Sequence, residues 1–404
     1  MMAGMARRKT GLTARKMQER PLVGISVDGA MGHGRALMRG VMRFANARRR
    51  WLLHEELRAV FPEGVPWPKC DGAIHAGGNA ALTAEIYQRS THVVLCSGNA
   101  DPTKTPVVCA DDHAVGAMAA SHLLDCNLEH FGFYGRMYEP VSVGRHAGFA
   151  EVLAQRGLTC SVSPVQWPDV YEWIKKTHWP ALQAWLQELP KPVGIFAWDD
   201  MAAHDLAAAC FQANIGVPDR VAILGVNNDD LLCDSAWPPL SSVEVDFVRV
   251  GFLAGQMLEK LITGEKIPKS ARMVRVPPKG IVRRQSTDVL AVEDAFLADA
   301  IRYIRNHACD PCTVRDVLKH VPVGRRWLER HLIETLGRTP HDEIIRVRVT
   351  TAQRLLQHPE ESIPHVADIC GFSAVPNMTR TFQQVLGTTP GAYRRKHLWE
   401  LRTR

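Results

Sequence analysis

The chain has 404 residues, enough for two or three domains, and its 46% apolar and 23% charged content is that of an ordinary globular protein. No apolar run approaches the roughly 18 residues that a membrane-spanning helix needs, and the basic N-terminus lacks the apolar core of a signal peptide. These features predict a cytoplasmic protein whose ten cysteines are reduced thiols.

The net charge of +7 is unevenly distributed along the chain. Residues 1–20 carry +5, residues 21–287 carry −1 and residues 288–404 carry +3. We interpret residues 1–20 as a basic, disordered tail that could also contact DNA phosphates. The nearly neutral middle of the chain has no electrostatic reason to bind nucleic acid. The two ends are positive, but +3 on residues 288–404 is weak support for DNA binding by itself.

Short apolar runs alternate with amphipathic runs over residues 21–287. Strands are predicted at residues 22–27, 71–77, 91–98, 106–112, 130–135, 192–200 and 221–229, with a final extended ribbon at 271–287. Helices are predicted at residues 35–49, 114–126, 145–157 and 201–215, and in the second half of 239–264. The alternation predicts doubly wound parallel sheets. Because it occurs in two series, we expect one α/β domain of two lobes with a cleft between them.

After residue 287 the pattern is helical throughout, and it contains an internal repeat. Residues 329–340 read ERHLIETLGRTP and residues 379–390 read TRTFQQVLGTTP. In both copies a glycine follows the last apolar turn, and a proline three residues later blocks continuation of the helix. A short helix and a glycine-containing turn precede each copy, which is a helix-turn-helix arrangement. We therefore predict an all-helical domain over residues 288–404.

The first repeated helix has two chemically different faces. At 100° per residue its leucines form one stripe, and Arg326 and Arg330 project from the opposite side. A solvated charged face on a packed helix is the ordinary alternative. The paired repeat favours DNA contact instead, because arginine suits guanine and phosphate. In the preceding helix, over 291–308, we place Phe296 on the apolar stripe with Ala300 and Ile304, and Leu297 and Ile301 on its flank.

The C-terminal domain resembles the AraC/XylS-type double helix-turn-helix transcription factors, along residues 352–395 and the first copy before them. Met378 departs from the aromatic residue usual there, and we expect it to fill the core. The resemblance leaves open whether Glu329 reads a cytosine or holds a neighbouring arginine. The DNA-binding residues expected are Arg325, Arg326, Glu329, Arg330, Asn377, Thr379 and Arg380.

Residues 21–287 resemble the ligand domain of LacI and periplasmic binding proteins, on segments 107–124, 145–149, 194–206 and 222–229. The resemblance implies a sugar cleft lined by carboxylate and guanidinium groups at strand ends. The hydroxyl binders expected are Arg35, Asp111, Arg145, Asp199 and Asn227. Asp111 and Asp199 could instead only cap helices, and Asn227 replaces the family's common Asp. We expect Trp198 in the core.

The combination implies a sugar-responsive regulator that binds a double-stranded DNA operator as a homodimer and contacts RNA polymerase. The expected role is activation of a pentose catabolic operon, with xylose as the first ligand. The alternatives are a regulator of another sugar or a non-sugar metabolite, a sugar-binding transport component and a sugar-phosphate enzyme. No nucleophile, base and orienting group occur together, so we expect neither an enzyme nor a cofactor. Cys309-x-x-Cys312 lacks a second ligand pair, so we predict structural thiols and no metal.

Overall fold

The computed structural model describes residues 20–48, 51–55, 66–77, 80–98, 101–167, 175–289, 294–356 and 361–403. The basic tail predicted at residues 1–20 lies outside these ranges except for its last residue. The chain divides into two compact units, Met1–Val289 and Leu290–Arg404. Within the described ranges, no helix has the length and apolar content that a bilayer crossing requires.

The first unit contains two six-stranded sheets, which define lobe 1 and lobe 2. Lobe 1 has the strand order β11-β5-β4-β3-β1-β2, and every pair is parallel. Lobe 2 has the order β12-β10-β9-β8-β6-β7, in which only β12 is antiparallel to its neighbour. The predicted two-lobed α/β fold is confirmed.

Lobe 1 consists of β1 (Leu22–Ser26), α1 (Gly32–Arg48), β2 (Leu52–Glu55), β3 (Cys70–His75), α2 (Ala80–Arg89), β4 (Ser90–Leu95), β5 (Val107–Ala110), α9 (Phe247–Ile262) and β11 (Met273–Val276). Lobe 2 consists of α3 (Asp112–Asp125), β6 (His130–Tyr134), α4 (Pro140–Ala154), β7 (Cys160–Val162), α6 (Trp179–Glu188), β8 (Val193–Ala197), α7 (Asp200–Gln212), β9 (Val221–Val226), α8 (Asp230–Ser235), β10 (Ser241–Glu244) and β12 (Gly280–Val282). Every residue of β5, β8 and β9 is buried, as expected for parallel strands covered on both faces.

The chain crosses between the lobes three times: after β5, after β10 and between β11 and β12. Residues 271–287, predicted as one extended ribbon, are therefore two strands in two different sheets. Strand β11 pairs with β5, and β12 pairs with β10. The three crossings form the connection about which the two lobes can move.

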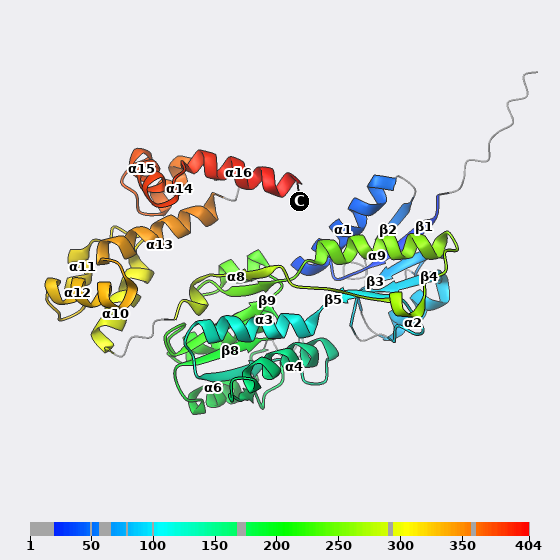
Figure 1. The fold of residues 1–404 in the computed structure, drawn as a ribbon, viewed down its shortest axis with the longest axis horizontal. Coiled ribbons are helices and arrows are strands. Elements are labelled where there is room, and N and C mark those ends of the chain that lie inside the picture. The colour runs from blue at the N-terminus through cyan, green and yellow to red at the C-terminus, as the bar shows by residue number, and fades with distance from the viewer. Residues whose placement is uncertain are drawn as a thin grey trace, which may run out of the picture. The chain divides into compact units, whose positions relative to one another are not determined.

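A pair of helices packs with backbones in direct contact in each lobe. In lobe 2, Figure 1 shows α3 and α4 side by side. A Cβ on Gly116 would lie 1.9 Å from the carbonyl oxygen of Arg145, and one on Gly148 would lie 1.9 Å from that of His113. Helices α1 and α9 approach in the same way at Gly40 and Gly251 in lobe 1. The close α3–α4 contact fixes Arg145 next to the start of α3.

The second unit is all helical, as predicted. It consists of α10 (Ala295–His307), α11 (Val314–His320), α12 (Arg325–Leu336), α13 (Pro340–Leu355), α14 (Ile363–Ile369), α15 (Val375–Leu386) and α16 (Pro390–Thr403). Helix α13 joins the group α10–α12 to the group α14–α16 (Figure 1). Helices α12 and α15 end at Gly337 and Gly387, whose φ angles of 68° and 66° are left-handed.

Both repeated helices bury their predicted apolar faces. Leu328 and Leu332 of α12 are fully buried, as are Met378 and Phe382 of α15. Pro340 and Pro390 do more than block a helix, because each begins the next one. On the predicted α10 stripe Ala300 and Ile304 are buried, whereas the prediction for Phe296 is wrong, because this side chain is 50% exposed. Among the α10 residues that are buried in the core are Leu297 and Ile301, which we had put on the flank.

A buried carboxylate ties the first helix-turn-helix group together. Glu343, at the start of α13, is fully buried and forms two 2.8 Å hydrogen bonds with Arg346. Arg338 and Arg305 lie 3.4 and 3.5 Å away, the latter on α10. Burial alone would raise the pKa of Glu343, but the hydrogen bonds and charges of these arginines lower it. The paired carboxylate thus joins α10, α13 and the turn after α12.

We predict that Gly116→Ala destabilises the first unit by about 1–3 kcal/mol, because the added methyl group forces α3 away from α4. Thermal unfolding followed by circular dichroism measures the change. Gly216→Ala is the matched control in lobe 2, since a Cβ there meets nothing within 4 Å. Equal melting temperatures for the two variants would contradict the close helix contact.

Candidate ligand cavity and nucleic-acid interface

A cavity of about 220 Å³ lies where strand ends of lobe 1 and lobe 2 meet. Its wall is formed by Asp28, Met31 and His33 of lobe 1 and by Arg136, Trp167, Trp198, Asp199, Asp200, Met201, Asn227, Asp229 and Leu232 of lobe 2. These residues follow the carboxyl ends of β1, β6, β7, β8 and β9. Open α/β sheets bind their ligands at this edge.

Asp229 links the two lobes at the cavity. Its Oδ2 accepts a 2.8 Å hydrogen bond from the Gly32 N–H, in the first turn of α1. A Cβ on Gly32 would lie only 2.6 Å from the same oxygen, so any side chain there would displace the carboxylate. The contact holds the lobes together in the observed arrangement.

Asp200, itself a buried residue of the wall, supports Asp229. Its Oδ2 accepts a 2.7 Å hydrogen bond from the Asp229 N–H, and its Oδ1 accepts one of 2.6 Å from the Ser242 hydroxyl. Burial raises the pKa of Asp200 to about 7, although these hydrogen bonds oppose the rise. Asp200 therefore changes charge near neutral pH at a point that positions the interlobe contact.

A left-handed turn after β9 presents Asn227 to the cavity. The φ angles of Asn227 and Asn228 are 104° and 51°, a region that asparagine tolerates better than most residues. Asn228 accepts a 3.0 Å hydrogen bond from the Arg284 guanidinium, and its N–H donates to Ser242 over 2.9 Å. These contacts fix the turn.

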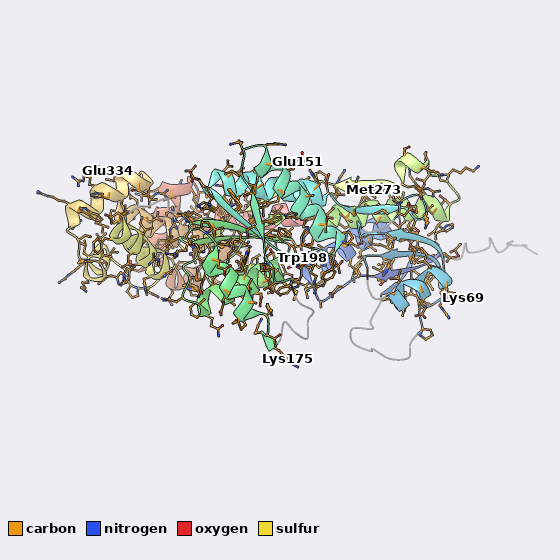
Figure 2. The ribbon with its side chains drawn as sticks, turned by 90° about the horizontal axis from the view of Figure 1, so that it is seen from below. Lys69, Glu151, Lys175, Trp198, Met273 and Glu334 are labelled. Atoms are coloured by element: carbon orange, nitrogen blue, oxygen red, sulfur yellow. The ribbon has the colours of Figure 1, made fainter. Side chains whose placement is uncertain are left out.

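An aromatic corner in lobe 2 holds a guanidinium group in the cavity wall. Arg136 Nε donates a 3.1 Å hydrogen bond to the carbonyl of Trp167, and the guanidinium carbon lies 5.5 Å from the ring centroid of Trp198. Trp167 packs edge-on against Tyr134, whose hydroxyl donates to the buried Asp205. Trp198 is labelled in Figure 2, within lobe 2.

Three buried polar atoms of the wall make no hydrogen bond to the described residues: Trp198 Nε1, Asn227 Oδ1 and Asp229 Oδ1. The first is a donor and the other two are acceptors. Buried polar groups are nearly always paired, so three unpaired atoms on residues of one cavity wall point to a polar ligand.

The structure places two of the five predicted hydroxyl binders, Asp199 and Asn227, in the cavity wall. Asp199 also caps α7, where it accepts a 2.7 Å hydrogen bond from the Ala202 N–H. Asp199 thus both caps a helix and lines the cavity. The predicted ligand role of each residue stays a prediction.

The other three predicted binders contact the framework around the cavity. Asp111 caps α3 by accepting from the Ala114 N–H over 3.1 Å. Arg145 is buried, donates to Asp112 over 3.0 Å and also binds the Trp198 carbonyl. Arg35 donates to the carbonyls of the β1–α1 loop. None of the three belongs to the described cavity wall.

Sequence reasoning missed several wall residues. Arg136 is the first basic residue after strand 130–134, and the rule that selected Arg35 after the first strand would have found it. Trp198, expected in the core, packs on the core of lobe 2 but is only half-buried and lines the cavity. His33 and Asp229 had no distinguishing sequence signal, because only the meeting of two lobes gives them a role.

The second unit presents the predicted DNA-binding residues on α12 and α15. Arg325 donates to Glu329 over 2.8 Å, and whether Glu329 also reads a cytosine stays a prediction. Arg330 is exposed, 3.9 Å from Glu334. On α15, the exposed Arg380 donates a hydrogen bond to Asn377. Thr379, the residue before Arg380, is half-buried. The exposed Arg326 completes the basic face of α12.

Comparisons with known proteins agree with this division. A family profile described as "Periplasmic binding protein-like domain" matches residues 120–287, and one described as "Helix-turn-helix domain" matches residues 317–396. The xylose operon regulatory protein of Haemophilus influenzae is 30% identical over 292 residues, 72% of this chain and 74% of that protein. The chain belongs to the family of the xylose operon regulatory proteins.

Solved structures show the same architecture. That of the xylose-binding transcription activator xylR has a TM-score of 0.77 at 24% identity and covers 93% of this chain and 98% of its own. A LacI family regulator from Enterococcus faecium with bound ribose has a TM-score of 0.52 at 20% identity, over 66% of this chain and 98% of its own. As a member of the xylose operon regulatory family, the protein is a transcriptional regulator and not an enzyme; its second unit binds DNA and its first binds a small-molecule effector.

We predict that the stability of the first unit depends on the charge of Asp200. Its pKa rises from the ordinary 3.8 to about 7 in the folded state, so the folded state favours the protonated carboxyl. Its contribution is complete below about pH 3.8 and is lost as pH rises through about 7, at about 1.4 kcal/mol per pH unit between these values.

Urea unfolding of wild type and Asp200→Asn from pH 5 to pH 8 measures this dependence. The difference in unfolding free energy between the two should change across this range, because only wild type titrates at residue 200. A constant difference would show that Asp200 keeps one charge throughout.

Proposed function

We propose that the effector of this regulator is a neutral monosaccharide, with a pentose, and xylose first, as the best candidate. The main support is that Trp198, Asn227 and Asp229 all line one cavity, and that Trp198 Nε1, Asn227 Oδ1 and Asp229 Oδ1 have no hydrogen-bond partner among the described residues. A sugar hydroxyl both donates and accepts, so a sugar can satisfy such a mixed set of groups. The family name and the ribose-bound structure support this choice.

The charge of the wall favours a neutral ligand. Four aspartates line the cavity, against the guanidinium of Arg136 and the imidazole of His33. Burial lowers the pKa of His33, which favours its neutral form. A phosphate or carboxylate ligand would therefore meet net repulsion. The cavity is also smaller than the roughly 300–1,000 Å³ of sites for drug-sized ligands, as a monosaccharide requires.

A ligand bound between the lobes would favour the arrangement in which the lobes are closed. In that arrangement the Asp229–Gly32 hydrogen bond connects the two lobes. A series of hydrogen bonds within lobe 2 connects the cavity wall to the last residues of the first unit. Arg284 binds Asn228 beside the cavity, and its own carbonyl accepts from the Ser241 hydroxyl, 3.0 Å away. Ser241 also accepts from Thr287, just before the second unit begins.

We further propose that the protein acts in the cytoplasm as a homodimer that activates a sugar catabolic operon and contacts RNA polymerase there. Family membership supports each part, because operator and metabolite are both cytoplasmic and LacI-type lobes usually pair. A regulator of another sugar or of a non-sugar metabolite is the alternative.

We predict that xylose raises the melting temperature of the purified protein more than hexoses or sugar phosphates do in a thermal-shift screen. Trp198→Phe keeps an aromatic side chain but removes the unpaired Nε1–H. Xylose affinity should therefore fall several-fold, which is a loss of about 1 kcal/mol of binding free energy. Asp230→Asn, on the exposed neighbour of Asp229, is the control and should bind as wild type. Undiminished xylose binding by Trp198→Phe, or a stronger response to a phosphorylated sugar, would refute the assignment.

We predict that Arg330→Ala and Arg380→Ala each weaken specific DNA binding by about 1–3 kcal/mol, if each arginine contacts a base. The probe is an operator duplex selected from random sequence by the wild-type protein, and a gel-shift titration gives Kd. Arg302→Ala removes an exposed arginine of α10, outside the reading helices, and should leave Kd within twofold. Wild-type affinity in the Arg330 and Arg380 variants would rule out base contacts there.

A further inference from the structure

The two helix-turn-helix groups contain cysteines that lie against each other. Cys309 stands in the turn between α10 and α11, half-buried, and Cys370 ends α14, fully buried. The next residue, Gly371, has a φ of 72°, and a Cβ on it would lie 2.6 Å from the carbonyl oxygen of Cys309. The turn of the second group therefore passes directly over the turn that carries Cys309.

The two thiols differ in chemistry. The Cys370 thiol donates a hydrogen bond to the Cys309 sulfur, and this contact, with help from Thr351 and Arg348, lowers the pKa of Cys309 to about 6. Cys309 is therefore mostly a thiolate at neutral pH, and it is the accessible member of the pair. The Cys370 thiol lies in contact with the Cys309 sulfur. A reactive sulfur beside a resolving thiol is the arrangement of a redox-sensitive pair.

Cys312 is closer in sequence but less suited to react with Cys309. Burial raises the pKa of Cys312, so it stays protonated. Arg348 of α13 donates to the carbonyls of Ala308, Asp310 and Cys312 over 2.6, 3.2 and 3.1 Å, which fixes the backbone of this turn. The held turn keeps Cys309 directed at Cys370.

We propose that Cys309 and Cys370 form a reversible disulfide, a modification site that joins the two helix-turn-helix groups. With a hydroperoxide as oxidant, the Cys309 thiolate attacks the terminal oxygen, the O–O bond breaks and an alcohol or water leaves. Cys309 becomes a sulfenic acid. The Cys370 thiol then attacks the Cys309 sulfur and loses its proton, and the sulfenic hydroxyl leaves as water. Two thiols and one hydroperoxide give one disulfide, one alcohol and one water.

The disulfide would constrain how α12 and α15 are presented to DNA, because it links the turns on either side of α13. The sulfurs must approach to about 2.05 Å, closer than two hydrogen-bonded thiols lie, so the two groups must shift toward each other. This consequence rests on DNA binding by both helices, whereas formation of the bond does not.

The experiment treats the reduced full-length protein with one equivalent of hydrogen peroxide at pH 7 and maps cross-linked tryptic peptides by mass spectrometry. Cys309 and Cys312 share one peptide, and fragmentation at the Asp310–Pro311 bond tells them apart. The expected major product joins Cys309 to Cys370. Cys370→Ser should abolish it, and Cys312→Ser is the control that keeps it. A major Cys309–Cys312 product, or irreversible oxidation of Cys309 without a cross-link, would overturn the proposal.

A second measurement does not depend on a folded Cys370 variant. Alkylation of Cys309 in wild type by iodoacetamide should rise with pH about a midpoint near 6, and a midpoint above 8 would overturn the proposal. Oxidised protein should bind the selected duplex at least threefold more weakly, with recovery after dithiothreitol. Unchanged affinity at full oxidation would overturn the regulatory role alone. Failure to select any duplex would instead count against the proposed DNA function.

Discussion

The ligand unit depends on one constraint: the chain passes between its two lobes three times, so strand ends from both sheets are held at one edge. Without these crossings, the acidic side chains after β1, β8 and β9 would lie on separate surfaces. Because the lobes meet, Asp229 can accept a hydrogen bond from the first turn of α1 in the opposite lobe. The cavity, its net negative wall and its unpaired polar atoms all follow from this meeting.

The chemistry of the cavity is organised in two layers. Trp198, Asn227 and Asp229 carry the unpaired polar atoms of the wall, while Asp200, Ser242 and Arg284 form a second layer that fixes Asn228 and Asp229. The second layer is costly to bury, as the raised pKa of Asp200 indicates. In return, this layer fixes both the left-handed turn at Asn227 and Asn228 and the residue that makes the interlobe hydrogen bond. Since the same layer reaches Thr287, the cavity wall and the last residues of the first unit share one buried network.

The DNA-binding unit uses one supersecondary element twice, and its two copies are supported differently. The first has Glu343 at its centre, a buried carboxylate surrounded by three arginines. The second relies on apolar packing of Met378 and Phe382. Arg348 and Cys309 lie where the copies meet, so the turn between α10 and α11 belongs to both. This junction joins the two groups that carry α12 and α15.

The sequence by itself determined the features that depend on local periodicity. The alternation of strands and helices, the fifty-residue repeat and the basic face of α12 are set by residues close along the chain, so each was predictable. Phe296 was misplaced because a helical stripe fixes relative, not absolute, orientation, and only the packing partner chooses the buried side. The small strands β2 and β7 carried too few residues to show a period.

Only the tertiary structure decided which polar residues share a site. Asp111, Asp199 and Asn227 look equivalent in sequence, because each follows a buried strand, yet only the last two line the cavity. The wall also takes Arg136, His33 and Asp229 from segments about a hundred residues apart or more. Residues 271–287 divide between two sheets for the same reason: pairing with β5 and β10 is a long-range choice that no local pattern encodes.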